Sequence, residues 1–121
     1  MKLVLVNALV KPFKFEEVEE ALSNVGIQGM TVTEVLGYSK DRSATAALIG
    51  KRVAWEEHKY FHLMVAVPDA KLADGKELVE VVVEGILQAA KTGKRHDGKV
   101  WISYLESAHR VRTGETGEYA V

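Results

Sequence analysis

The chain contains the stretch Thr92-Gly93-Lys94-Arg95-His96-Asp97-Gly98-Lys99, in which two glycines enclose four charged or titratable side chains. Glycine adopts positive φ and lets backbone N–H groups approach a ligand closely, so the stretch is interpreted as a loop. Lys94, Arg95 and Lys99 supply charge of the kind that binds phosphate. We therefore predict an anion site, most simply a nucleotide phosphate site. The alternative is a solvated hairpin loop, since the spacing matches neither a Walker nor a Rossmann motif.

A second cationic segment, Arg110-Val111-Arg112-Thr113-Gly114-Glu115, follows one apolar run, Val100 to Leu105. The run predicts a strand, and a further strand is predicted through Val111 after a short turn. Arg110 and Arg112 are two positions apart, so on a strand they would point to the same face.

Composition predicts one domain over residues 1–121 and excludes several functions. The chain has 121 residues, 47% hydrophobic and 27% charged, which is usual for a globular protein. A net charge of −1 argues against a general nucleic-acid-binding protein. The absence of cysteine excludes disulfides and thiolate chemistry, and it fits a cytoplasmic protein. The apolar stretch 3–10 is too short to span a membrane.

Hydrophobic periodicity predicts alternating strands and helices. Continuous or alternating apolar runs indicate strands, and stripes at i, i+3, i+4 and i+7 indicate helices. The predicted strands are Leu3 to Val10, Gly29 to about Tyr38, Tyr60 to Val67 and Val100 to Leu105, besides the one through Val111. The predicted helices are Phe15 to Val25 and about Lys76 to Lys91, with a connector from Ala70 to Gly75 and a loose tail from Gly114 to Val121.

The segment from Ser39 to about Lys59 shows no clear period. A loop of this length is unusual in a compact domain and is generally functional or disordered. We predict a mobile loop that orders on a partner protein, with Trp55 as a partner contact. The alternative is a short helix around Ala44 to Leu48.

The order strand, helix, strand, strand, helix, strand predicts an α+β fold, the ferredoxin-like βαββαβ sandwich. Its sheet is antiparallel and both helices cover one face. The other face of such a sheet often meets another subunit, and strands that are apolar on both faces favour that outcome.

Taken together, these residues and the predicted fold resemble the PII signal-transduction proteins. The resemblance covers most of the chain and rests on five blocks in the right order: Lys11-Pro12-Phe13-Lys14, Val25 to Val35, Val67-Pro68-Asp69, Thr92 to Lys99, and Arg110 to Glu115. It implies a homotrimer that binds adenine nucleotide (ADP, ATP or AMP) in clefts between subunits and signals through the long loop to a partner such as a transporter or an enzyme.

The resemblance also assigns residues. Thr31 and the backbone around Met64 to Ala66 would contact base and ribose, while the Thr92 to Lys99 loop and the two arginines would hold the phosphates. The predicted nucleotide-binding residues are Thr31, Ser39, Lys40, Met64, Ala66, Gly93, Lys94, His96, Asp97, Gly98, Lys99, Arg110 and Arg112. The predicted partner-binding residues are Arg42, Lys51, Arg52 and Trp55.

Several positions depart from the nitrogen-sensing members. A gapless alignment places Asp41 where those members carry a glutamine for magnesium and 2-oxoglutarate, Tyr60 where they carry a lysine for 2-oxoglutarate, and Val53 where some carry a modified tyrosine. Lys40 replaces an arginine, and His96 replaces a glycine. We therefore expect no classical 2-oxoglutarate sensing, leave magnesium open, and predict bicarbonate as a second effector near Lys40, Arg42 or His96.

An enzyme is the weaker class. His58, Tyr60 and His62 would share one face of a strand, but an exposed or hydrogen-bonded histidine is commoner than a metal ligand. We predict no metal site and no catalytic residue. The alternative to a regulator is a small ferredoxin-like trimeric enzyme or a metal-tolerance protein with the same fold.

Overall fold

The computed structural model describes residues 2–40 and 54–121 of the chain. Both predicted helices are present there, and so are the predicted strands as far as residue 105. In order, the elements are β1 (Leu3–Val10), the 3-10 helix η1 (Pro12–Lys14), α1 (Phe15–Asn24), β2 (Thr31–Lys40), β3 (Trp55–Pro68), α3 (Leu78–Ala90), β4 (Gly98–Leu105) and the 3-10 helix η2 (Gly117–Ala120).

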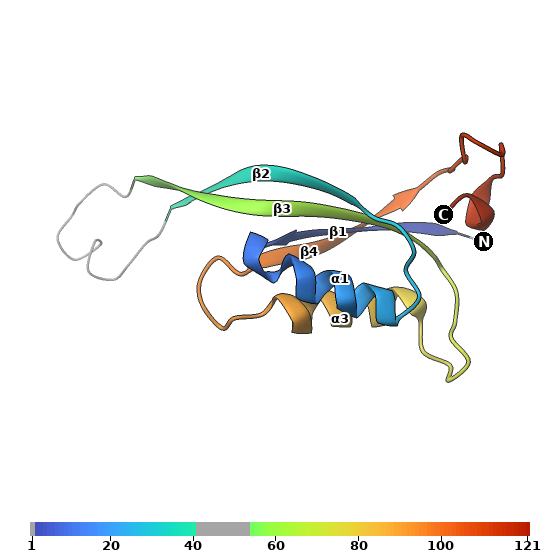
Figure 1. Ribbon diagram of the computed structural model, residues 1–121, viewed down its shortest axis with the longest axis horizontal. Helices are drawn as coiled ribbons and strands as arrows, with labels where there is room; N and C mark the ends of the chain where they lie inside the picture. Colours follow the sequence, from blue (N-terminus) through green and yellow to red (C-terminus); the bar gives the residue numbers. More distant parts are fainter. Residues whose placement is uncertain (1, 41–53) are drawn as a thin grey trace.

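The strands form a sheet of order β2-β3-β1-β4 in which all neighbours are antiparallel. Figure 1 shows α1 and α3 together on one face of this sheet. The arrangement is the ferredoxin-like sandwich, which confirms the predicted fold class.

The core lies between the helices and the covered face of the sheet. Alternate residues of β1 point to this face, which matches the period of two in a strand. The side chains that pack there come from both inner strands and both helices: Val4, Val6, Ala8, Val10, Val18, Leu22, Leu63, Val65, Val67, Val82, Ile86 and Ala90. β1 ends before Pro12, which begins η1 and cannot donate to a ladder.

The other face of the sheet is left uncovered by helices (Figure 1). On it, His62 stacks on Trp101 with 5.4 Å between ring centroids, and its Nε2 lies 3.0 Å from Asn7 Oδ1. Trp101 remains 40% exposed. This is the face on which the sequence predicts contact with another subunit.

The prediction of a loop from Ser39 to Lys59 is wrong at both ends. β2 continues to Lys40 and β3 begins at Trp55, so that Ser39 pairs with Glu56 and Lys40 with Trp55. Figure 1 shows the two strands projecting as a ribbon beyond the rest of the sheet. No helix covers this ribbon and most of its residues are exposed, so its sequence needs no apolar alternation, which is why periodicity missed it. The proposed helix around Ala44 to Leu48 lies outside the described residues.

The strand predicted through Val111 is also wrong. Residues 111–113 form a turn, in which the Arg110 N–H donates to Glu115 O at 2.8 Å and the Gly114 N–H donates to Arg110 O at 2.8 Å. Gly114 has a φ of 73°, so turn chemistry overrode the apolar pattern. The tail is less loose than predicted, since η2 forms within it. Neither helix in the described ranges is both long and apolar enough to cross a membrane.

Candidate functional site

Asp97 organises the cationic loop between α3 and β4. Its carboxylate accepts hydrogen bonds from the Thr92 and Gly93 N–H groups, each at 2.9 Å, and from the Thr92 hydroxyl. Lys11 Nζ lies 3.1 Å from the same carboxylate. These contacts, with those of the Thr92 side chain and backbone foremost, hold the pKa of Asp97 far below its ordinary value. Asp97 therefore shapes the loop, and a direct contact with nucleotide stays a prediction.

The two glycines of the loop serve the fold. Gly93 has a φ of 79°, but its N–H donates to Asp97 and is not aimed outward at a ligand as the sequence suggested. Gly98 has a φ of 108°, and a Cβ built on it would lie 1.8 Å from the Leu9 carbonyl oxygen. Gly98 is therefore required for the close approach of β4 to β1. The cationic side chains Lys94, Arg95 and Lys99 are all exposed on this loop and the start of β4.

A second group of predicted residues lines a hollow of about 670 Å³. Thr31, Met64, Ala66 and Arg110 meet there, although they come from β2, β3 and the segment after β4. The sequence missed two other walls, residues 25–30 after α1 and residues 120–121 of the tail. Gly26, with a φ of 90°, was a signal for the first of these, because it ends α1 and redirects the chain toward the hollow. Arg112 lies exposed in the turn two residues beyond Arg110.

The loop and the hollow lie at opposite ends of β4. β4 leaves the loop at Gly98 and, as a strand of eight residues, reaches Leu105 on the side where Arg110 follows. A strand of that length spans roughly 24 Å. Figure 1 shows the loop after α3 on the side of the molecule from which the β2–β3 ribbon projects, and the C-terminal segment on the opposite side. One chain therefore does not bring its cationic loop and its two arginines to the same ligand.

A smaller cavity of about 220 Å³ lies between the loop and the base of the β2–β3 ribbon. Ser39, His96 and Lys99, all predicted as site residues, line it together with His58 and Tyr60. The ring of Tyr60 fits there because it crosses Gly37, where an added Cβ would lie 2.6 Å from Tyr60 Cε2.

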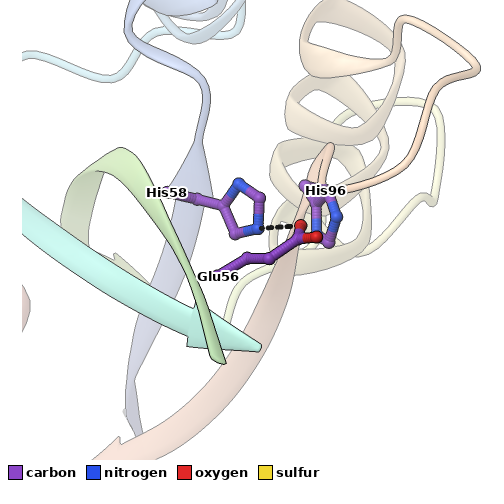
Figure 2. Close-up of side chains that lie close together, drawn as sticks. All are labelled: Glu56, His58 and His96. Atoms are coloured by element: carbon purple, nitrogen blue, oxygen red, sulfur yellow. Dashed lines mark ion pairs between the residues drawn. The ribbon is translucent and has the colours of Figure 1, made fainter. Parts of the chain in front are cut away.

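The histidine arrangement differs from the one considered from sequence. His62 pairs with Asn7 and Trp101, whereas His58 faces His96 and Glu56 (Figure 2). Ligand atoms of Glu56, His58 and His96 all lie within 4.8 Å of one another. The sequence missed this group, because His96 reaches it from a loop distant along the chain.

Lys40 and Trp55 meet at the far end of the described ribbon. Lys40 Nζ lies 4.9 Å from the centroid of the Trp55 ring, and Trp55 is 64% exposed. An exposed aromatic beside a cation suits a protein contact. The other predicted partner residues, Arg42, Lys51 and Arg52, lie outside the described residues, as do Asp41 and Val53.

Comparisons with known proteins agree on one group. The family model described as "Nitrogen regulatory protein P-II" matches residues 1–115. A nitrogen regulatory protein P-II from Haemophilus influenzae is 40% identical over 116 residues, covering 96% of this chain and 97% of the relative. The B. subtilis GlnK-ATP complex superimposes with a TM-score of 0.81 at 23% identity, covering 99% and 98%. Arabidopsis thaliana PII bound to citrate gives a TM-score of 0.74 at 29% identity, covering 99% and 92%.

Proposed function

Because the chain belongs to the nitrogen regulatory protein P-II family, we propose that it regulates a partner protein by binding adenine nucleotide in clefts between the subunits of a homotrimer. The family consists of regulatory proteins and not of enzymes, so the alternative of a small enzyme is set aside. The nucleotide is ADP, ATP or AMP.

The observation that carries the proposal is the placement of the predicted site residues. The cationic loop from Thr92 to Lys99 and the hollow with Thr31 and Arg110 lie at opposite ends of one chain. Closed cyclic symmetry would bring the loop of one subunit to the hollow of its neighbour. Base and ribose would then occupy the hollow, beside Met64 and Ala66. The phosphates would meet Lys94 and Lys99 from one chain and Arg110 and Arg112 from the next.

The solved relatives support the class of ligand. The similar B. subtilis protein forms an ATP complex, and the similar Arabidopsis protein binds citrate, an anion. A second effector that is a small anion, bicarbonate in particular, would suit the cavity lined by Ser39, His96 and Lys99. Titrations with and without magnesium would show whether the nucleotide binds together with this ion.

The segment from 39 to 59 is the proposed route to the partner protein, with Trp55, Arg42, Lys51 and Arg52 as its contacts. Within the described part of this segment, Lys40 and Trp55 place a cation beside an exposed aromatic ring. The bound ligand changes this segment only by its differential affinity for two conformations. We place the protein in the cytoplasm, as its cysteine-free sequence leads us to expect, and without nucleic acid as partner.

The proposal does not include classical 2-oxoglutarate sensing. The position at which the nitrogen sensors would offer a lysine is Tyr60, which is buried, with its ring against Gly37. A tyrosine hydroxyl gives a dicarboxylate no positive charge.

Calorimetric titration with AMP, ADP and ATP tests the proposal, with and without magnesium, bicarbonate and 2-oxoglutarate. We expect adenylate binding without turnover. Arg112→Ala should weaken phosphate-dependent binding by about 1.5–3 kcal/mol, because it removes a charge-assisted hydrogen bond. Glu106→Ala, an exposed residue outside both groups, is the control. Absence of adenylate binding by the unmodified trimer would overturn the proposed function.

A further inference from the structure

Three potential metal ligands converge where the cationic loop meets the β2–β3 ribbon. Glu56 and His58 are two apart on β3 and therefore share a face. Glu56 Oε2 lies 3.7 Å from His58 Nε2, a separation longer than a good hydrogen bond. His96 arrives from the loop and stacks on His58, with 3.7 Å between ring centroids and 23° between ring planes. Figure 2 shows the Glu56 carboxylate beside both rings.

Two polar atoms at this place lack the partner that burial normally demands. His58 Nε2 and Ser39 Oγ are both buried, and neither has a hydrogen-bond partner among the described residues. Both residues line the same 220 Å³ cavity. Buried polar atoms without a partner call for an explanation, of which an absent ion is one. A neutral imidazole carries one ring nitrogen with a lone pair, which is the atom that a metal ion binds.

The backbone at His96 supports a role for its side chain. His96 has a φ of 64° and is the one non-glycine residue with positive φ in the described ranges. Glycine would adopt this conformation without strain. The loop thus holds an imidazole where its own backbone geometry favours glycine, and that imidazole is directed at His58.

We propose that Glu56, His58 and His96 bind a divalent transition-metal ion such as Zn²⁺. Two imidazoles and one carboxylate are a ligand set for zinc and its borderline neighbours, which leaves a fourth position open. At bonds of about 2.0–2.1 Å, tetrahedral ligand atoms lie about 3.4 Å apart. The present atoms lie within 4.8 Å of one another, and binding would require the stacked His58 and His96 rings to turn so that their lone pairs converge on the ion.

The open position faces a cavity that Lys99 also lines. One carboxylate leaves a divalent ion with a net positive charge, and Lys99 adds to it. An anionic oxygen, such as hydroxide or a phosphate oxygen, therefore suits the fourth position, and Ser39 Oγ can hydrogen-bond to it. The ion would fasten the loop to the base of the ribbon.

The test is titration of the metal-free, nucleotide-free protein with Co²⁺, whose visible absorption reports tetrahedral nitrogen and oxygen ligands, followed by competition with Zn²⁺. We expect saturable Co²⁺ binding with the intense visible absorption bands of tetrahedral Co²⁺. These bands should disappear when Zn²⁺ displaces the bound Co²⁺. His58→Ala should weaken Co²⁺ binding at least about tenfold, as loss of a ligand exceeds the effect of outer-shell changes. No nucleotide takes part, so failure here is distinguishable from failure of the proposed function.

His96→Gly separates ligation from folding. Glycine fits the positive φ, so this variant should keep or raise the melting temperature while losing the Co²⁺ bands. His109→Ala, an exposed histidine in the C-terminal region, should bind Co²⁺ like the unmodified protein. The proposal is overturned if His58→Ala and His96→Gly retain wild-type Co²⁺ affinity, or if His109→Ala loses as much.

Discussion

Asp97 shows how a single residue can shape a loop through contacts within the chain. The negative charge of its carboxylate is matched by Lys11 at 3.1 Å and by two backbone N–H donors. The exposed cations Lys94 and Lys99 are thereby left to set the potential at the loop surface.

The first prediction concerns the pH dependence of this residue. The folded-state pKa of Asp97 is depressed, so its carboxylate stabilises the fold above the ordinary aspartate pKa of about 3.9, and that contribution is lost as pH falls toward the folded value. Asp97→Asn should therefore lower the melting temperature at pH 5–7, and the gap to the unmodified protein should narrow below about pH 4. Thermal unfolding across that pH range measures the difference in melting temperature between the two proteins. A difference that stays constant with pH would contradict the depressed pKa of Asp97.

The second prediction separates two glycines with positive φ. Gly98→Ala should destabilise the protein by on the order of 3 kcal/mol, because strain at φ is joined by a clash with the Leu9 carbonyl. Gly75→Ala is the matched control: its φ is 87°, but an added Cβ meets nothing within 4 Å. Backbone strain alone should lower the free energy of unfolding of Gly75→Ala by about 1 kcal/mol. Equal losses in urea unfolding would show that the contact with β1 is unimportant.

From the sequence, Gly93, Asp97 and Gly98 were predicted to contact the ligand, and that stays a prediction, whereas the contacts they make within the chain were not predicted. Their observed contacts are with Thr92, Lys11 and Leu9. Thr92 lies in the loop itself, Leu9 lies on β1 and Lys11 follows β1, and a loop pattern carries no information about which other segment it will meet.

The elements follow from periodicity wherever one face is buried. The apolar patterns of α1, α3, β1 and β3 could be recognised in the sequence, because each of these elements packs one face into the same core. The exceptions lie where packing is weak. The outer halves of β2 and β3 pair in solvent, and Arg110 and Arg112 belong to a turn whose own hydrogen bonds hold it.

The third prediction tests which face of α3 carries stability. Ile86 is 1% exposed between α1 and the sheet, whereas its neighbour Leu87 is 47% exposed. Ile86→Ala should cost about 2–5 kcal/mol through lost burial and a cavity. Leu87→Ala should cost well under that, because its helix propensity loss is small and little area is buried. Chemical unfolding of both variants measures the difference between their losses of stability. Similar losses would show that Ile86 and Leu87 contribute equally to the core.

At the scale of the whole molecule, the distance between the loop and the arginines becomes the central fact. In the sequence only one short strand separates the two cationic segments, and the resemblance assigned both to the phosphates in clefts between subunits. The structure shows that this strand carries the chain from one end of the sheet to the other (Figure 1). The two cationic segments are therefore near each other in sequence but far apart in one chain, and the proposed nucleotide cleft needs a second copy of the chain.

This requirement gives the last prediction, a complementation between defective chains. One variant carries Lys94→Ala and Lys99→Ala, and the other carries Arg110→Ala and Arg112→Ala. Each homotrimer alone lacks half of every proposed cleft and should bind ADP weakly. In trimers refolded from an equal mixture, a cleft is intact when its loop comes from the second variant and its arginines from the first, which holds for about one quarter of clefts. Calorimetry should therefore show a tight-binding fraction near that value. A site contained within one chain would show no recovery on mixing, and that result would exclude the shared cleft.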